Sequence, residues 1–91
     1  MITVESAPTA QGWDADVEIV AGERRSRHNV RVTHDDLVRW GAPGEDGPEE
    51  LVQRAFEFLL AREPADQILK SFELSDVLRY FPEFDAEMRR S

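Results

Sequence analysis

The second half of the chain contains the stretch that decides the fold, LVQRAFEFLLAREPADQILKSFELSDVLRYFPEF, from Leu51 to Phe84. It holds all five phenylalanines and the only tyrosine of the 91 residues. Large apolar side chains of this kind are mostly buried in folded proteins. The stretch therefore predicts where the hydrophobic core forms, and it contains no motif that specifies a chemical reaction.

The first part of this stretch predicts a long helix from about Pro48 to Glu63. Proline suits the first position of a helix, and Pro64 would end it. At about 100° per residue, the apolar side chains of this helix cover an arc of about 200°. These side chains are Leu51, Val52, Ala55, Phe56, Phe58, Leu59 and Leu60. A helix on one face of a sheet needs about half that width, so we expect contacts from two sides, with a second copy of the chain as the alternative for part of the arc.

Shorter apolar groups after Pro64 predict several short helical pieces. Their residues are Ile68, Leu69, Phe72, Leu74, Val77, Leu78 and Phe81. The first three predict about one turn of helix, and Ser75 is a candidate N-cap for the helix that follows. A last helix is expected from Glu83 to Arg90.

The N-terminal part of the chain predicts an antiparallel β-hairpin. Apolar and polar side chains alternate in residues 13–20 and again in residues 25–32, which is typical of half-buried strands. Gly22-Glu23 fits a two-residue turn that begins with glycine. With the turn at these residues, Trp13 faces Val32 on the apolar side of the hairpin.

Four arginines near the second of these strands are the candidate interaction surface: Arg24, Arg25, Arg27 and Arg31. In the predicted register, Glu18 faces Arg27 and Asp14 faces Arg31. Cross-strand pairs of this kind contribute up to ~1 kcal/mol each. Pairing within the sheet therefore explains most of the cluster. A phosphate-binding patch is the alternative, and it would return if the register slipped by one residue.

Two further elements are expected outside the hairpin and the long helix. Met1 to Glu5 alternates and is a candidate third strand, so residues 1–12 form either a flexible arm or an extra edge strand. Thr33 predicts the N-cap of a short helix from His34 to Trp40. The predicted fold is a single α+β domain of residues 1–91, in which an N-terminal antiparallel hairpin packs against a central helix and short C-terminal helices.

Two motifs resemble those of a known family. FEFLLAREP (residues 56–64) and YFPEF (residues 80–84, within SDVLRYFPEF) are similar to motifs of a family of short bacterial proteins of unknown function. The resemblance covers about residues 13–88 and includes HNVRVT (residues 28–33), which in the family is a strand that enters a short helix. It implies a small α+β domain, and it brings no activity, substrate or ligand residues.

Composition and charge exclude several classes of function. The 19 acidic and 11 basic residues give a net charge of −8, which repels the phosphate backbone of nucleic acids. The absence of cysteine excludes a disulfide framework, a thiolate metal site and a cysteine nucleophile. No apolar run approaches the ~20 residues of a membrane helix, and the N-terminus lacks a signal-peptide pattern. We therefore expect a cytoplasmic protein without a membrane partner.

Only two histidines are available for acid–base or metal chemistry. His28 lies on the predicted inner face of a strand, where a buried structural histidine is common. His34 stands beside Asp35 and Asp36 in the first turn of a helix, where favourable helix-end electrostatics explain the carboxylates better than a metal does. We therefore expect no catalytic, cofactor-binding or metal-binding residues and no cofactor.

Two hypotheses of function follow from these patterns. The preferred one is a non-enzymatic, acidic protein-interaction module whose partner is another protein or a second copy of the chain. The alternative is a small nucleic-acid-associated regulator, antitoxin-like or transcription-linked, that would use the Arg24–Arg31 region. An enzyme comes third, because it would need a deep pocket that gathers His28 or His34 with carboxylates.

Overall fold

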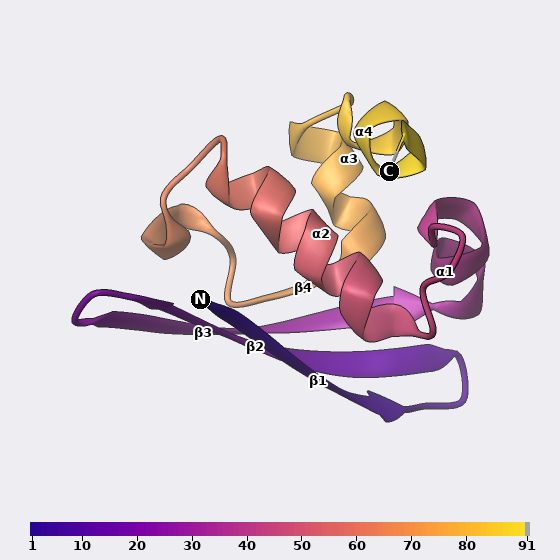
Figure 1. The fold of residues 1–91 in the computed structure, drawn as a ribbon, viewed down its shortest axis with the longest axis horizontal. Helices are drawn as coiled ribbons and strands as arrows, with labels where there is room; N and C mark the ends of the chain where they lie inside the picture. The colour runs from indigo at the N-terminus through magenta and orange to yellow at the C-terminus, as the bar shows by residue number, and fades with distance from the viewer. Residues whose placement is uncertain (91) are drawn as a thin grey trace.

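The computed structural model describes residues 1–90 (of Arg90 only the backbone) and forms a four-stranded sheet whose helices lie on one face (Figure 1). The strands, in spatial order, are β1 (Ile2–Pro8), β2 (Gly12–Ala21), β3 (Arg24–Thr33) and β4 (Ser71–Glu73). The helices are α1 (His34–Trp40), α2 (Pro48–Leu60), α3 (Val77–Tyr80) and α4 (Phe84–Arg90), and two 3₁₀ turns are η1 (Ala65–Gln67) and η2 (Leu74–Asp76). This arrangement confirms the predicted α+β fold class. Within residues 1–90, no helix has the length and apolar character needed to cross a membrane.

The hairpin of β2 and β3 has the predicted register. Trp13 pairs with Val32 and Val17 pairs with His28. Gly22 adopts a φ of 63° in the turn, a left-handed conformation that glycine reaches at little cost. Residues 2–8 form the additional edge strand β1, which extends beyond the predicted end at Glu5 and pairs antiparallel with β2.

Helix α2 lies over the sheet and is contacted from two sides, as its wide apolar arc predicts. On the sheet side, the Phe56 ring packs against His28 and Phe72, with ring centroids 5.4 and 6.0 Å away. On the opposite side, the Phe58 ring meets Phe81 and Phe84 edge to face. Every residue of the predicted arc is buried except Leu60, which is half-buried. A single chain therefore covers the arc, and a second copy is not needed for it.

Helix α2 ends earlier than predicted, at Leu60 instead of Glu63. The backbone N–H groups of Arg62 and Glu63 both donate to the carbonyl of Leu59, at 3.0 and 2.9 Å. These contacts tighten and close the last turn, a common way for a helix to satisfy its final carbonyls. The helix therefore ends three residues before the predicted boundary, and residues 61–63 form a tightened turn between Leu60 and Pro64.

The prediction of a helical turn at Ile68, Leu69 and Phe72 is wrong. The chain instead leaves η1 in an extended conformation and forms β4, which pairs parallel with β3 and sets Phe72 beside Val30. Ile68 and Phe72 still enter the core, whereas the side chain of Leu69 is exposed. Tertiary pairing with the β3 edge overrides the weak helical pattern of such a short segment.

The prediction of Ser75 as an N-cap is also wrong. The reciprocal capping contacts are made by Glu73 and Asp76, and the Glu73 N–H donates to the Asp76 carboxylate at 3.2 Å. Ser75 is exposed inside η2. The predicted cap at Thr33 is confirmed, because its hydroxyl accepts from the Asp36 N–H while the Asp36 carboxylate accepts from the Thr33 N–H.

Candidate interaction surfaces

The four arginines that the sequence singled out lie on β3 and around the hairpin turn, but they do not converge on one point. Arg25 and Arg27 each approach the Glu18 carboxylate at 3.5 Å, and their side chains are 70% and 85% exposed. Arg31 faces Asp14 across the two strands, as predicted, and its guanidinium donates to the Ser71 hydroxyl at 3.2 Å. Arg24 is exposed where β3 begins, opposite Ala21.

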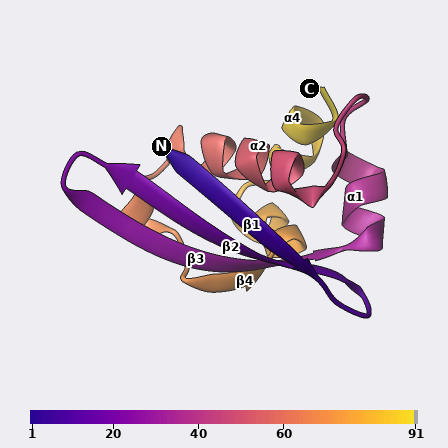
Figure 2. The same ribbon diagram turned by 60° about the horizontal axis from the view of Figure 1, so that its bottom comes forward.

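Arg25, Arg27 and Arg31 share the open face of the sheet, which is turned away from the helices (Figure 2), with a larger number of carboxylates. By strand register, the acidic residues of this face are Glu5, Asp14, Asp16, Glu18 and Glu73. The Asn29 amide donates to both Asp14 and Asp16 and holds two of them in place. Interleaved charges of opposite sign give a phosphate group little net attraction.

His28 is a structural residue. It is 3% exposed, its Nδ1 lies 2.8 Å from the Leu69 carbonyl oxygen, and its Nε2 lies 3.0 Å from the Ser26 hydroxyl. A carbonyl can only accept, so Nδ1 carries the proton and Nε2 accepts from Ser26. Burial lowers the pKa of His28, which keeps the ring neutral. The ring thereby ties β3 to the residues that lead into β4.

His34 packs against an aromatic ring. Its ring stands edge-on to Trp13 with a centroid distance of 4.8 Å, while Asp36 beside it is engaged in the helix cap. In the part of the chain that the structure describes, no three His, Asp or Glu side chains are grouped closely enough to hold a metal ion. The carboxylates after His34 therefore fit the helix-end interpretation.

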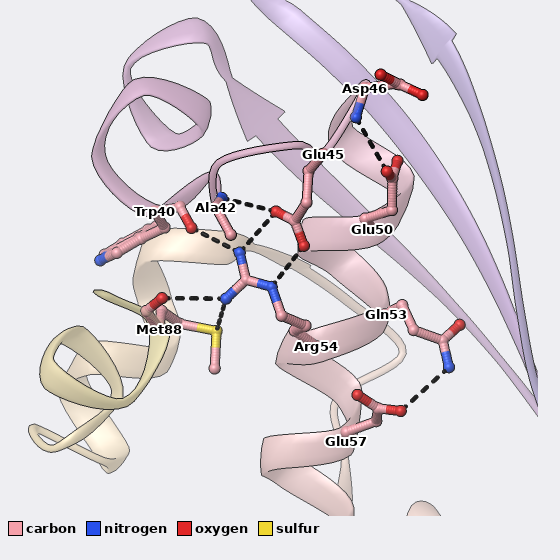
Figure 3. Close-up of polar contacts among 9 residues, drawn as sticks. All are labelled: Trp40, Ala42, Glu45, Asp46, Glu50, Gln53, Arg54, Glu57 and Met88. Carbon is pink, nitrogen blue, oxygen red and sulfur yellow. Dashed lines mark hydrogen bonds and ion pairs between the residues drawn. The ribbon is translucent and has the colours of Figure 1, made fainter. Parts of the chain in front are cut away.

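The most buried charge cluster of the molecule is centred on Arg54 of α2 (Figure 3). The Arg54 guanidinium binds both oxygens of Glu45, at 2.7 and 2.8 Å, and donates to the backbone carbonyls of Trp40 and Met88. Glu45 also accepts from the Ala42 N–H at 2.8 Å. The cluster thus joins the ends of α1 and α4 to α2 and to the loop between α1 and α2.

The Arg54 cluster is a structural clasp. The side chains of Arg54 and Glu45 are only 15% and 14% exposed, and the guanidinium, which has five N–H donors, makes four hydrogen bonds to protein oxygens. Hydrogen bonds from Arg54 hold the pKa of Glu45 below its ordinary value. Because most of the N–H donors of the Arg54 guanidinium are bonded to protein oxygens, few are left to bind a ligand.

An open groove with an apolar floor, which we call the Leu69–Tyr80 groove, lies on the described part of the molecule. Its volume is about 420 Å³, within the range of natural binding sites. It lies between the end of α2, the segment from η1 to β4, and α3. Its lining residues are Leu59, Glu63, Gln67, Ile68, Leu69, Phe72, Asp76, Val77, Tyr80 and Phe81.

Two large apolar side chains stand exposed on this groove. Leu69 is 53% exposed and Tyr80 is 66% exposed, although neither is at a loop tip or a chain end. The charged residues of the lining are both acidic, Glu63 and Asp76. The groove therefore combines an apolar floor, two apolar walls and a negative rim.

Comparison of the chain with protein-family models, with curated proteins and with solved structures found no match. The resemblance to the family of short bacterial proteins therefore stays a prediction.

Sequence reasoning did not find the Leu69–Tyr80 groove. It assigned Leu69 to a helical turn and treated the whole run from Ile68 to Phe81 as core. No sequence signal separated the residues of this run that are buried from Leu69 and Tyr80, which are exposed. Which of them would be left outside depends on the pairing of β4 with β3, and that pairing is tertiary.

Proposed function

We propose that the chain is a non-enzymatic protein-interaction module that receives an apolar side chain of a partner protein in the Leu69–Tyr80 groove. The observation that supports this most directly is the exposure of Leu69 and Tyr80 beside a hollow with an apolar floor. Tyrosine is among the residues enriched in the central contacts of protein interfaces, and such contacts commonly fill pockets. The structural roles of His28 and Arg54 support the non-enzymatic part of the proposal, because those groups are occupied by the fold.

The charge of the groove indicates the chemistry of the partner. Glu63 and Asp76 lie at the rim, and the whole chain carries a net charge of −8. A segment with one large apolar side chain next to lysine or arginine would bury apolar surface and meet the rim with complementary charge. The occupant that we propose is therefore a short segment of another protein with an apolar anchor and a basic neighbour.

A random peptide library provides the direct test. Twelve-residue peptides are selected for binding to the folded, immobilised chain. The double variant Leu69→Ser/Tyr80→Ser is present in solution as a competitor, and the peptides that stay bound to the wild-type chain are sequenced. We expect enrichment of peptides with a large apolar residue beside a basic one. Their affinity should fall about tenfold or more in the double variant, since truncation of central contacts commonly costs ~2 kcal/mol.

The matched control is Val38→Ser, which removes an exposed apolar side chain from α1, away from the groove. It should leave peptide affinity unchanged, and circular dichroism should show that both variants are folded. Selection of no peptide, or of peptides that bind the double variant equally well, would contradict the proposal. Enrichment of acidic peptides would contradict the proposed partner chemistry.

The second candidate, a nucleic-acid-associated regulator, is favoured only by the exposure of Arg25 and Arg27. Both lie on the hairpin that extends beyond the helices in Figure 1. Binding of short DNA and RNA duplexes at low salt, compared with an Arg25→Ala/Arg27→Ala variant, decides between the two candidates. Tight binding that the variant loses would favour the regulator, whereas we expect no binding, because Glu18 and its neighbouring carboxylates oppose a phosphate backbone.

A further inference from the structure

We infer that the outer edge of β1 is a second docking site, which accepts an extended basic segment of another protein as an added strand. Figure 2 shows β1 at the edge of the sheet, with β2 on its other side. This site does not depend on the Leu69–Tyr80 groove, which lies near the opposite edge at β4. The two sites can therefore be tested separately.

The register of β1 determines which backbone groups are free. Met1 and Val20 exchange both of their backbone hydrogen bonds, with N–O distances of 2.8 and 2.9 Å. In an antiparallel pair, hydrogen-bonded and non-hydrogen-bonded pairs alternate along the strands. The N–H and C=O groups of Thr3, Glu5 and Ala7 therefore point to β2, and those of Ile2, Val4 and Ser6 point outward from the sheet. These three alternate residues present free backbone N–H and C=O groups, with which an added strand could pair.

There is room for a strand beside β1. A shallow hollow of about 380 Å³ adjoins Val4 and is lined by α2 and by the loop before it. Its other lining residues are Glu45, Glu49, Glu50, Gln53 and Arg54. Glu49 also accepts a hydrogen bond from Ser6, which shows that this side of α2 borders the edge strand. Side chains of an added strand would therefore rest on an acidic surface.

The charges at this edge select the occupant. Arg54, the only cation of the hollow, is already bonded to Glu45 and to two carbonyls. Glu49 and Glu50 are left to face the hollow, and Glu5 lies on the adjacent open face of the sheet. Negative charge therefore borders both faces of an added strand, and lysine or arginine at alternate positions, which all point to one face, can be directed toward Glu49 and Glu50. Pairing with a second β1 would instead bring two sets of these glutamates together, and such like-charge contacts disfavour the dimer.

Hydrogen exchange measured by NMR tests the geometry with a defined probe, an acetylated and amidated heptapeptide of alternating lysine and valine. In the free chain we expect the amides of Ile2, Val4 and Ser6 to exchange quickly and those of Thr3 and Glu5 slowly. With the peptide at saturation, exchange at Val4 and Ser6 should slow about tenfold or more, and Thr3 and Glu5 should change little. Binding should weaken as salt is raised, because the contacts are electrostatic.

Two variants separate the backbone contribution from the charge contribution. Val4→Pro removes an outward N–H that the sheet does not use, so the fold should persist while peptide affinity falls at least tenfold. Glu49→Gln/Glu50→Gln should lower affinity several-fold and reduce its salt dependence. Glu23→Gln, at the exposed hairpin turn, is the matched charge control and should change neither property.

Three results would overturn the inference. One is slow exchange of the Ile2, Val4 and Ser6 amides in the free chain at every concentration, which would mean that the edge is already covered. The second is protection that grows with protein concentration alone, which would make a second copy the occupant. The third is equal binding of the lysine–valine peptide and a glutamate–valine peptide, which would remove the charge argument. If the lysine–valine peptide does not bind the chain while the Leu69–Tyr80 groove still selects peptides from the library, only the inference about the β1 edge is contradicted.

Discussion

At the scale of single residues, we expect the hydrogen bonds of Arg54 to make a large contribution to stability. Its replacement in Arg54→Met leaves the buried Glu45 carboxylate and two backbone carbonyls without their donor. Removing one partner of a buried pair typically costs 3–5 kcal/mol, so we expect a loss of about 3 kcal/mol in the free energy of unfolding. Urea denaturation measures it.

Arg79→Met is the control for the Arg54 prediction. Arg79 is 80% exposed and approaches Asp76 only at 4.0 Å. Exposed pairs contribute little, so this variant should change stability by less than about 0.5 kcal/mol. Equal effects of the two variants would show that the Arg54 cluster does not hold the elements together.

His28 gives stability a pH dependence near neutrality. Burial lowers its pKa in the folded chain below the ordinary value of 6.5, so the unfolded chain takes up the proton first. Stability is therefore complete above pH ~7.5 and falls as the pH drops through 6.5 toward the folded pKa, by at most about 1.4 kcal/mol per pH unit. Urea denaturation between pH 5.5 and 8 measures this slope.

The His28→Gln variant should flatten that slope, because the titrating ring is gone. His34→Gln removes the other, exposed histidine and should keep the slope. If the slope survives in His28→Gln and disappears in His34→Gln, the burial of His28 is not its cause. NMR titration of the two imidazole rings in the wild-type chain checks the assignment directly.

At the scale of elements, the helix caps distinguish a confirmed prediction from a wrong one. Thr33 caps α1 through its hydroxyl, and Thr33→Ala should cost about 1 kcal/mol. Ser75 fits the same sequence pattern, but the capping contacts are made by Glu73 and Asp76 instead. Ser75→Ala should therefore change stability by less than about 0.5 kcal/mol in thermal or urea unfolding. A larger loss at Ser75 than at Thr33 would contradict these contacts.

The elements also show what could be predicted from sequence. The hairpin register was predictable, because alternation in β2 and β3 and a glycine-first turn all agreed on one pairing. Strand β4 was not, because three residues give no periodicity and their conformation depends on the edge of β3 and on the His28 contact to Leu69. The groove was missed for the same reason, since it exists only once β4 has been placed.

At the scale of the whole molecule, the wide apolar arc of α2 is covered by contacts within one chain. Phe56 packs toward the sheet and Phe58 toward the C-terminal helices, so neither face of the helix is left for a second copy. The sequence hypothesis of a homodimer rested on that arc, and it loses this support. The surfaces that we propose for partners are the Leu69–Tyr80 groove and the outer edge of β1.

A single chain completes its own core, and we propose that it keeps its binding surfaces free for other proteins. Sedimentation equilibrium from about 1 to 100 μM tests it most directly. We predict one species with the monomer mass of 10.4 kDa over the whole range. A dimer at low micromolar concentration that Leu69→Ser/Tyr80→Ser or Val4→Pro dissociates would contradict the claim, because those surfaces would then bind a second copy of the chain.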